Sequence, residues 1–158
     1  MRQIKVLALG LAMVMALFSL PVWAATEGTI DVTVTPKNIS LSVSPNSYNY
    51  GALGLNVTTE TATTFAVSND GNVNENFLVK GYNTAAWTLA ATNGANQYVH
   101  EWKEETAGSY AALTTSNQTA ASGVASGNDV DYRLRIKTPT STSSFTQQAP
   151  NVTFTATE

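Results

Sequence analysis

From residue 30 onward, apolar side chains recur at every second position in run after run of the chain. This period of two is the pattern of half-buried β-strands, and no segment after residue 25 shows the 3.6-residue period of a helix. Clusters of Gly, Pro, Asn and Ser separate the runs. The pattern therefore predicts an all-β fold, a two-sheet antiparallel immunoglobulin-like sandwich of about eight or nine strands. The clearest runs lie at 30–34, 39–43, 61–68, 76–81, 86–90, 97–103, 130–137 and 152–157.

The chain contains no cysteine, so hydrophobic packing alone must hold the two predicted sheets together. We expect the core to contain Trp87, Phe65, Phe77, Tyr132, Leu134 and Phe154. Trp87 is expected in the middle of a strand and fully buried. Two stretches are poor in large side chains. Residues 114–128 are predicted to be either a polar edge strand with a loop or a mobile surface excursion, and in 138–148 only Phe145 could reach the core.

The first residues have the three parts of a secretory signal peptide. Arg2 and Lys5 make a basic start, residues 6–20 are almost wholly apolar, and small residues surround Ala24. We expect cleavage after Ala24, which leaves a single domain over 25–158; cleavage after Ala25 and an uncleaved membrane anchor are the alternatives. No second hydrophobic stretch follows, so no transmembrane segment is predicted in the mature chain. The predicted location is extracellular, at the cell surface or in the periplasm.

The composition excludes several functional classes. Only 12% of residues are charged, and removal of residues 1–24 takes away two of the eight basic residues and changes the net charge from −3 to −5. A chain without a basic patch is not a nucleic-acid binder. The absence of cysteine excludes a disulfide scaffold and any zinc site built on thiolates.

Residues that could carry catalysis are few. His100 is the only histidine, it lies within a predicted strand, and no Gly-x-Ser-x-Gly motif accompanies it, so a nucleophilic triad is not predicted. Glu101, Glu104 and Glu105 could supply a pair of carboxylates, but no apolar sequence surrounds one of them to make it an acid. We therefore predict that the protein is not an enzyme and binds no cofactor.

Residues 69–75 (Asn-Asp-Gly-Asn-Val-Asn-Glu) place oxygen-bearing side chains close together. Calcium prefers such ligands, but the spacing does not match the calcium loop of an EF-hand. A hairpin turn explains the same Asn and Gly residues. We therefore predict no metal site, and calcium at this turn stays the alternative.

Several short motifs resemble bacterial surface β-sandwiches. Residues 41–51 are similar to their opening strand, with Pro45 followed by Tyr48-Asn49-Tyr50-Gly51, and residues 65–73 resemble one of their turns. Trp87-Thr88-Leu89 resembles the first Trp-x-Leu motif of the WxL cell-surface domains, and residues 152–157 their last strand. The second Trp-x-Leu motif of that family is absent. The resemblance implies an immunoglobulin-like fold and an extracellular setting.

These observations predict an exported, non-enzymatic structural or cell-surface protein, which could self-assemble or act as an adhesin. The alternative is a carbohydrate-binding module that uses Tyr98, Trp102 and Tyr110 as an exposed aromatic surface. The expected partners are further copies of the chain or a glycan of the cell envelope.

The run at 30–34 offers a means of self-association. Gly28–Thr35 is predicted to form a strand that follows the cleavage site and ends at Pro36. This strand could pair within its own sheet. It could also pair with the sheet edge of a neighbouring molecule, where Ile30, Val32 and Val34 would fill successive pockets.

Overall fold

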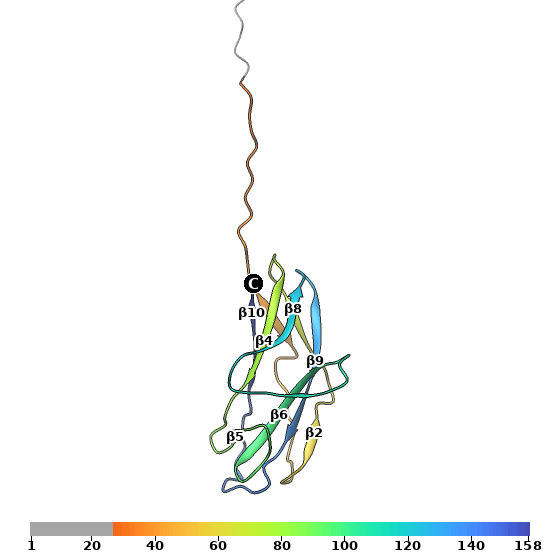
Figure 1. Ribbon diagram of the computed structural model, residues 1–158, viewed down its shortest axis with the longest axis vertical. Coiled ribbons are helices and arrows are strands. Elements are labelled where there is room, and N and C mark those ends of the chain that lie inside the picture. The colour runs from red at the N-terminus through yellow and green to blue at the C-terminus, as the bar shows by residue number, and fades with distance from the viewer. Residues whose placement is uncertain (1–26) are drawn as a thin grey trace, which may run out of the picture. The chain divides into compact units, whose positions relative to one another are not determined.

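The computed structural model describes residues 27–158, and these contain ten β-strands and no helix (Figure 1). Residues 36–158 form one compact unit, which we call the body, and residues 27–35 belong to a separate unit, which we call the N-terminal segment. The predicted signal peptide and its cleavage site at Ala24 lie outside the described residues. The strands are β1 (Leu41–Ser44), β2 (Thr58–Glu60), β3 (Phe65–Asn69), β4 (Glu75–Gly81), β5 (Thr88–Leu89), β6 (Gln97–Glu104), β7 (Ala111–Ala112), β8 (Gln118–Val124), β9 (Asp129–Lys137) and β10 (Val152–Thr157).

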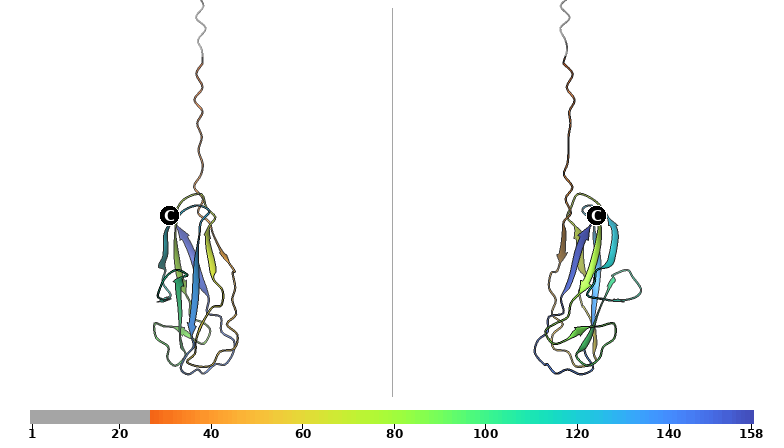
Figure 2. Two further views of the ribbon diagram at one scale, coloured as in Figure 1. Left: turned by 90° about the vertical axis from the view of Figure 1, so that its right-hand side faces the viewer. Right: turned by 60° about the vertical axis from the view of Figure 1, so that its left-hand side comes forward.

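The strands form two sheets, which confirms the all-β, two-sheet prediction. The larger sheet has the order β1-β3-β9-β6-β5, with β2 also paired to β9 and β7 to β6. The smaller sheet has the order β10-β4-β8, and its three strands lie side by side in Figure 2. All strand pairs are antiparallel except β5 with β6.

The core lies between the two sheets, because the strands alternate buried and half-buried residues. Val67 on β3 and Tyr132 on β9 meet Phe77 and Val79 on β4 in one cluster of buried side chains. Of the six predicted core residues, Phe65, Phe77, Tyr132 and Leu134 are buried. Phe154 is half-buried, since it lies on the edge strand β10, and packs on the same cluster.

The prediction that Trp87 is fully buried in mid-strand is wrong. Trp87 precedes the two-residue strand β5 and is half-buried. Its ring packs against Tyr98 at a centroid distance of 6.1 Å, and its Nε1 donates a hydrogen bond to Thr142 Oγ1 (3.0 Å). The main chain bends here because Thr84 Oγ1 accepts a hydrogen bond from the Trp87 amide. Trp87 therefore closes the side of the core instead of filling its centre.

We expect the substitution Trp87→Ala to lower the free energy of unfolding by about 1–2 kcal/mol, because only part of the ring is removed from water in the native state. A fully buried tryptophan would cost about 3–5 kcal/mol. Urea unfolding, followed by circular dichroism, measures the difference. A loss of about 3 kcal/mol or more would show that the ring stabilises the fold as much as a fully buried side chain does.

Two further predictions about the N-terminal and polar regions need correction. Residues 28–35 do not form a strand, and the first strand of the described chain is β1. Phe145 does not reach the core, because 84% of its surface is exposed. Residues 114–128 do include a polar edge strand, β8, as one of the two alternatives predicted.

Candidate functional site

The three aromatic residues predicted to contact a ligand do not share one surface. Tyr98 is fully buried, its hydroxyl donates to the carbonyl of Tyr82, and burial raises its pKa well above the usual range. Trp102 is half-buried and packs on Tyr132 on the core side of the larger sheet. Tyr110 lies on the outer side, where its ring is 4.2 Å from the guanidinium carbon of Arg135. No platform of three exposed rings results.

Two of the three glutamates that could act as a catalytic pair, Glu101 and Glu105, are bound to arginines. Glu101 accepts a hydrogen bond from Arg135 Nε (2.7 Å), and Glu105 forms an ion pair with Arg133. The hydrogen bond from Arg133 lowers the pKa of Glu105, which favours the carboxylate form. A general acid needs the opposite shift, so these contacts stabilise the sheet surface and do not prepare an acid.

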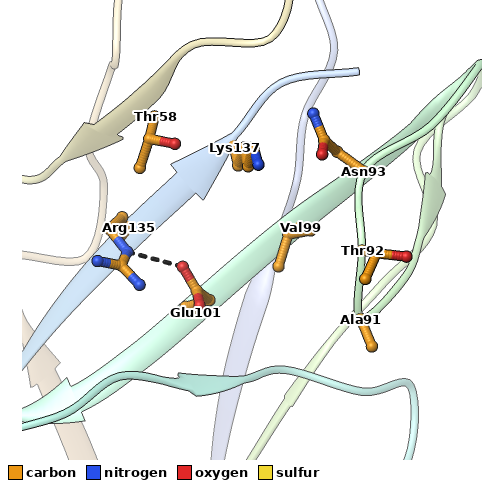
Figure 3. A pocket seen from close by; sticks show the side chains of 8 residues that line it. All are labelled: Thr58, Ala91, Thr92, Asn93, Val99, Glu101, Arg135 and Lys137. Carbon is orange, nitrogen blue, oxygen red and sulfur yellow. Dashed lines mark hydrogen bonds and ion pairs between the residues drawn. The ribbon is translucent and has the colours of Figure 1, made fainter. Parts of the chain in front are cut away.

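The Glu101–Arg135 pair also lines an open hollow of about 350 Å³ on this face. Figure 3 shows the two side chains directed at each other, with Val99 beside them and Asn93 and Lys137 toward the upper part of the view. The charge of Arg135 is compensated by Glu101, and Asn93 Nδ2 donates to Asn56 Oδ1 and to the carbonyl of Thr138, so these side chains already have partners within the protein.

His100, the only histidine, belongs to the core. It is 2% exposed, its Nε2 lies 3.3 Å from the hydroxyl of Tyr50, and the ring of Tyr98 packs beside it. Burial lowers its pKa from 6.5 to about 4, because the charged form loses its hydration. His100 is therefore neutral at pH 7 and has no surface on which it could meet a substrate.

The Asn-rich turn predicted as a hairpin joins the two sheets instead, because β3 and β4 belong to different sheets. The side-chain atoms of Asn69 are already in use, whereas Oε2 of Glu75 is buried and has no hydrogen-bond partner among residues 27–158. Asn69 donates to the carbonyls of Val73 and Val124 (both 2.8 Å), and its Oδ1 accepts from the amide of Gly71. Within residues 27–158 no group of three or more acidic or histidine side chains could hold a metal ion.

The same turn fixes the point where the body begins. Asn72 Oδ1 accepts from the amide of Asn38 (2.8 Å), its Nδ2 donates to the carbonyl of Pro36 (2.9 Å), and its own amide donates to the Asn38 carbonyl (3.0 Å). We call these three bonds the Asn72 clamp. Gly71 is required beside it, because a Cβ atom there would lie 2.4 Å from the Asn38 carbonyl oxygen. Sequence patterns missed this role, since the partners are more than thirty residues apart.

Two further contacts hold the same end of the body. The carboxylate of Glu75, fully buried, accepts a hydrogen bond from the amide of Ser40 (2.8 Å) just before β1. Lys37 forms an ion pair with Glu158, next to the last residue of β10. The start of β1 and the end of β10 therefore lie at one end of the body.

The N-terminal segment carries three large aliphatic side chains in solvent. Ile30, Val32 and Val34 are 85%, 85% and 89% exposed, and they alternate with Asp31 and Thr33. Within the described chain these residues belong to no strand. In an extended conformation, alternate side chains point to opposite sides, so the three aliphatic groups would form one apolar face.

The body in turn has two strands at sheet edges whose inward side chains are incompletely covered. Among residues 27–158, β10 pairs with β4 alone and β1 with β3 alone. The half-buried residues of these two edges pack on the central core cluster: Leu41 and Val43 on β1, and Val152, Phe154 and Ala156 on β10. The two edges approach each other.

No protein-family model matches this sequence, and a search of curated proteins gives no match. Among the described residues, no helix is long and apolar enough to cross a bilayer.

Proposed function

We propose that the protein is an exported, non-enzymatic structural subunit that associates with further copies of itself through residues 28–35. The observation that carries this proposal is the exposure of Ile30, Val32 and Val34 on a segment with the alternation of a strand and no strand partner among residues 27–158. We further propose that the domain has an immunoglobulin-like fold and is extracellular, at the cell surface or in the periplasm, as the sequence predicts.

The energetics favour a partner for this segment. Burial of an aliphatic side chain of this size contributes about 1.5–3 kcal/mol, so three of them supply several kcal/mol toward association. The main-chain hydrogen bonds of an added strand would fix its register against the strand that it pairs with. The low charge of the segment, with Asp31 alone between Gly28 and Thr35, opposes pairing only weakly.

A carbohydrate-binding module is less well supported. Tyr98 has no exposed surface, and Trp102 and Tyr110 lie on opposite sides of the larger sheet. Sugar-binding platforms need rings that are open to solvent on the same side.

The substitution Val32→Asp tests the proposal, because it places a charge on the apolar face of the segment. We expect the native chain to form oligomers and the Val32→Asp chain to elute as a monomer in size-exclusion chromatography with light scattering. The matched control is Thr33→Asp, which adds the same charge on the opposite face and should leave the oligomers in place. A native chain that stays monomeric at high concentration, or two variants that behave alike, would contradict the proposal.

A further inference from the structure

We infer that the acceptor is the edge of β10 in a second copy, which receives residues 28–35 as an additional, antiparallel strand of the smaller sheet. This inference rests on the proposed function and names its site. It follows from three features of the described residues: the regularity of the β10 edge, the side-chain pattern of the two segments, and the direction in which the chain enters the body.

Of the edges in the body, β10 is the best suited to pairing. It has six residues that pair with β4 without a register shift, from Val152 opposite Gly81 to Thr157 opposite Asn76. The other edge of the same sheet, β8, has register shifts against β4 and a left-handed Gly123 (φ +66°), and such irregularities hinder the pairing of a further strand. The remaining edge strands, β1, β2, β5 and β7, have four residues or fewer.

The side-chain patterns of donor and acceptor match. On β10, Val152, Phe154 and Ala156 face the core, and Thr153, Thr155 and Thr157 alternate with them. Directly opposite residues of an antiparallel pair share a face. Placing Val32 opposite Phe154 therefore sets Ile30 beside Ala156 and Val34 beside Val152. On the other face, Thr33 meets Thr153 and Thr29 meets Thr157.

The added strand would also cover the second exposed edge. Figure 2 shows β1 next to β10 at this side of the body, and Leu41 and Val43 of β1 are half-buried on the same core cluster. An apolar face laid along β10 would contact these side chains too. The apolar side chains of both edges are only half-buried. An added strand with aliphatic side chains at alternate positions would cover them.

The chain direction selects a second copy over the chain's own segment. The Lys37–Glu158 pair places the beginning of the body at the end of β10. The chain's own residues 28–35 could therefore lie along β10 only in the parallel direction, after a reversal at Pro36, whose carbonyl is fixed by the Asn72 clamp. A segment from another copy is free to run antiparallel, which is the slightly more stable arrangement.

A contact of this kind joins unlike surfaces, so each copy has one donor and one acceptor. In the antiparallel register, Val34 of the donor reaches Val152, at the end of β10 opposite to Glu158. The body of the donor then lies beyond that end of the acceptor. Successive copies are joined head to tail, and the assembly has no fixed number of subunits unless it closes into a ring.

The cysteine-free chain allows a direct test by disulfide cross-linking. Two differently tagged, full-length chains are coexpressed, one with Thr33→Cys and the other with Thr153→Cys, and oxidised. We expect a product of twice the monomer mass that carries both tags and disappears on reduction, since opposite residues of neighbouring strands approach disulfide distance. The pair Thr29→Cys with Thr157→Cys tests the antiparallel direction in the same way. The control pair is Thr33→Cys with Thr119→Cys, an exposed threonine on β8, and should not cross-link.

The outcomes separate this inference from the proposed function. Oligomers that form without a cross-link at either β10 pair, or that cross-link equally at β8, would overturn the β10 acceptor and leave self-association intact. Oligomers that persist in the Val32→Asp chain would overturn the proposed function itself. Cross-linking at both β10 pairs that is lost when Val32→Asp is added to the donor chain would establish the acceptor.

Discussion

Replacing Phe77 with alanine is expected to lower the free energy of unfolding by about 3–5 kcal/mol. Phe77 is fully buried on the central strand of the smaller sheet and contacts residues from both sheets. Its loss leaves a cavity that the surrounding strands cannot close, and the loss is a large share of the roughly 5–15 kcal/mol that stabilise a typical domain.

Urea unfolding of the native and Phe77→Ala chains measures this effect. Phe145→Ala provides the matched control, because the same side chain is removed at a position that is 84% exposed. The control should change stability by less than about 0.5 kcal/mol. Equal effects at the two positions would contradict the described core.

Acid is expected to destabilise the protein through His100. Its pKa in the folded chain, about 4, lies below the value of 6.5 for an unperturbed histidine. The unfolded chain therefore binds a proton first as the pH falls, and stability declines from about pH 6.5 down to about pH 4, where the loss through this residue reaches about 3 kcal/mol. Above pH 6.5 both states are neutral and the contribution is constant.

The substitution His100→Gln isolates this contribution, because glutamine does not titrate and its amide can still form a hydrogen bond with the hydroxyl of Tyr50. Denaturant unfolding at pH 7 and at pH 4 gives the two free-energy differences. The native chain should lose more stability than the variant over this interval. Identical pH profiles would show that His100 becomes protonated in the folded state without cost. The ion pairs of Glu101 and Glu105 remain in both chains, so their response to acid cancels.

Several strands of the body were predictable because half-buried strands alternate apolar and polar residues, whereas β2 and β7 lie outside the predicted runs. β9 and β10 lie at their predicted positions within one residue for this reason. Trp87 was mispredicted because a large aromatic residue beside Leu89 resembles a strand interior, while the local bend depends on Thr84 and on Thr142, more than fifty residues away. A pattern of local residues carries no information about such distant partners.

The candidate site was predictable in part. Ile30, Val32 and Val34 were singled out from their alternation alone, and they are exposed, but the strand predicted over 28–35 is absent from the described chain. The turn at 69–75 has the residue types of a hairpin, yet it connects strands of two different sheets. The strands with which β3 and β4 pair depend on packing in the core and not on the residues of the turn. The role of Asn72 could not be predicted, since a turn asparagine has many local uses.

The Asn72 clamp has a mechanical consequence. A pull on residues 28–35 reaches the body at Pro36 and would, without the clamp, act directly on β1, a four-residue edge strand that could peel from β3 one pair at a time. The three bonds of Asn72 receive the load before β1 does and pass it to the turn between β3 and β4. Tension is thereby shared between both sheets, so that the short edge strand β1 is shielded from force applied along the chain.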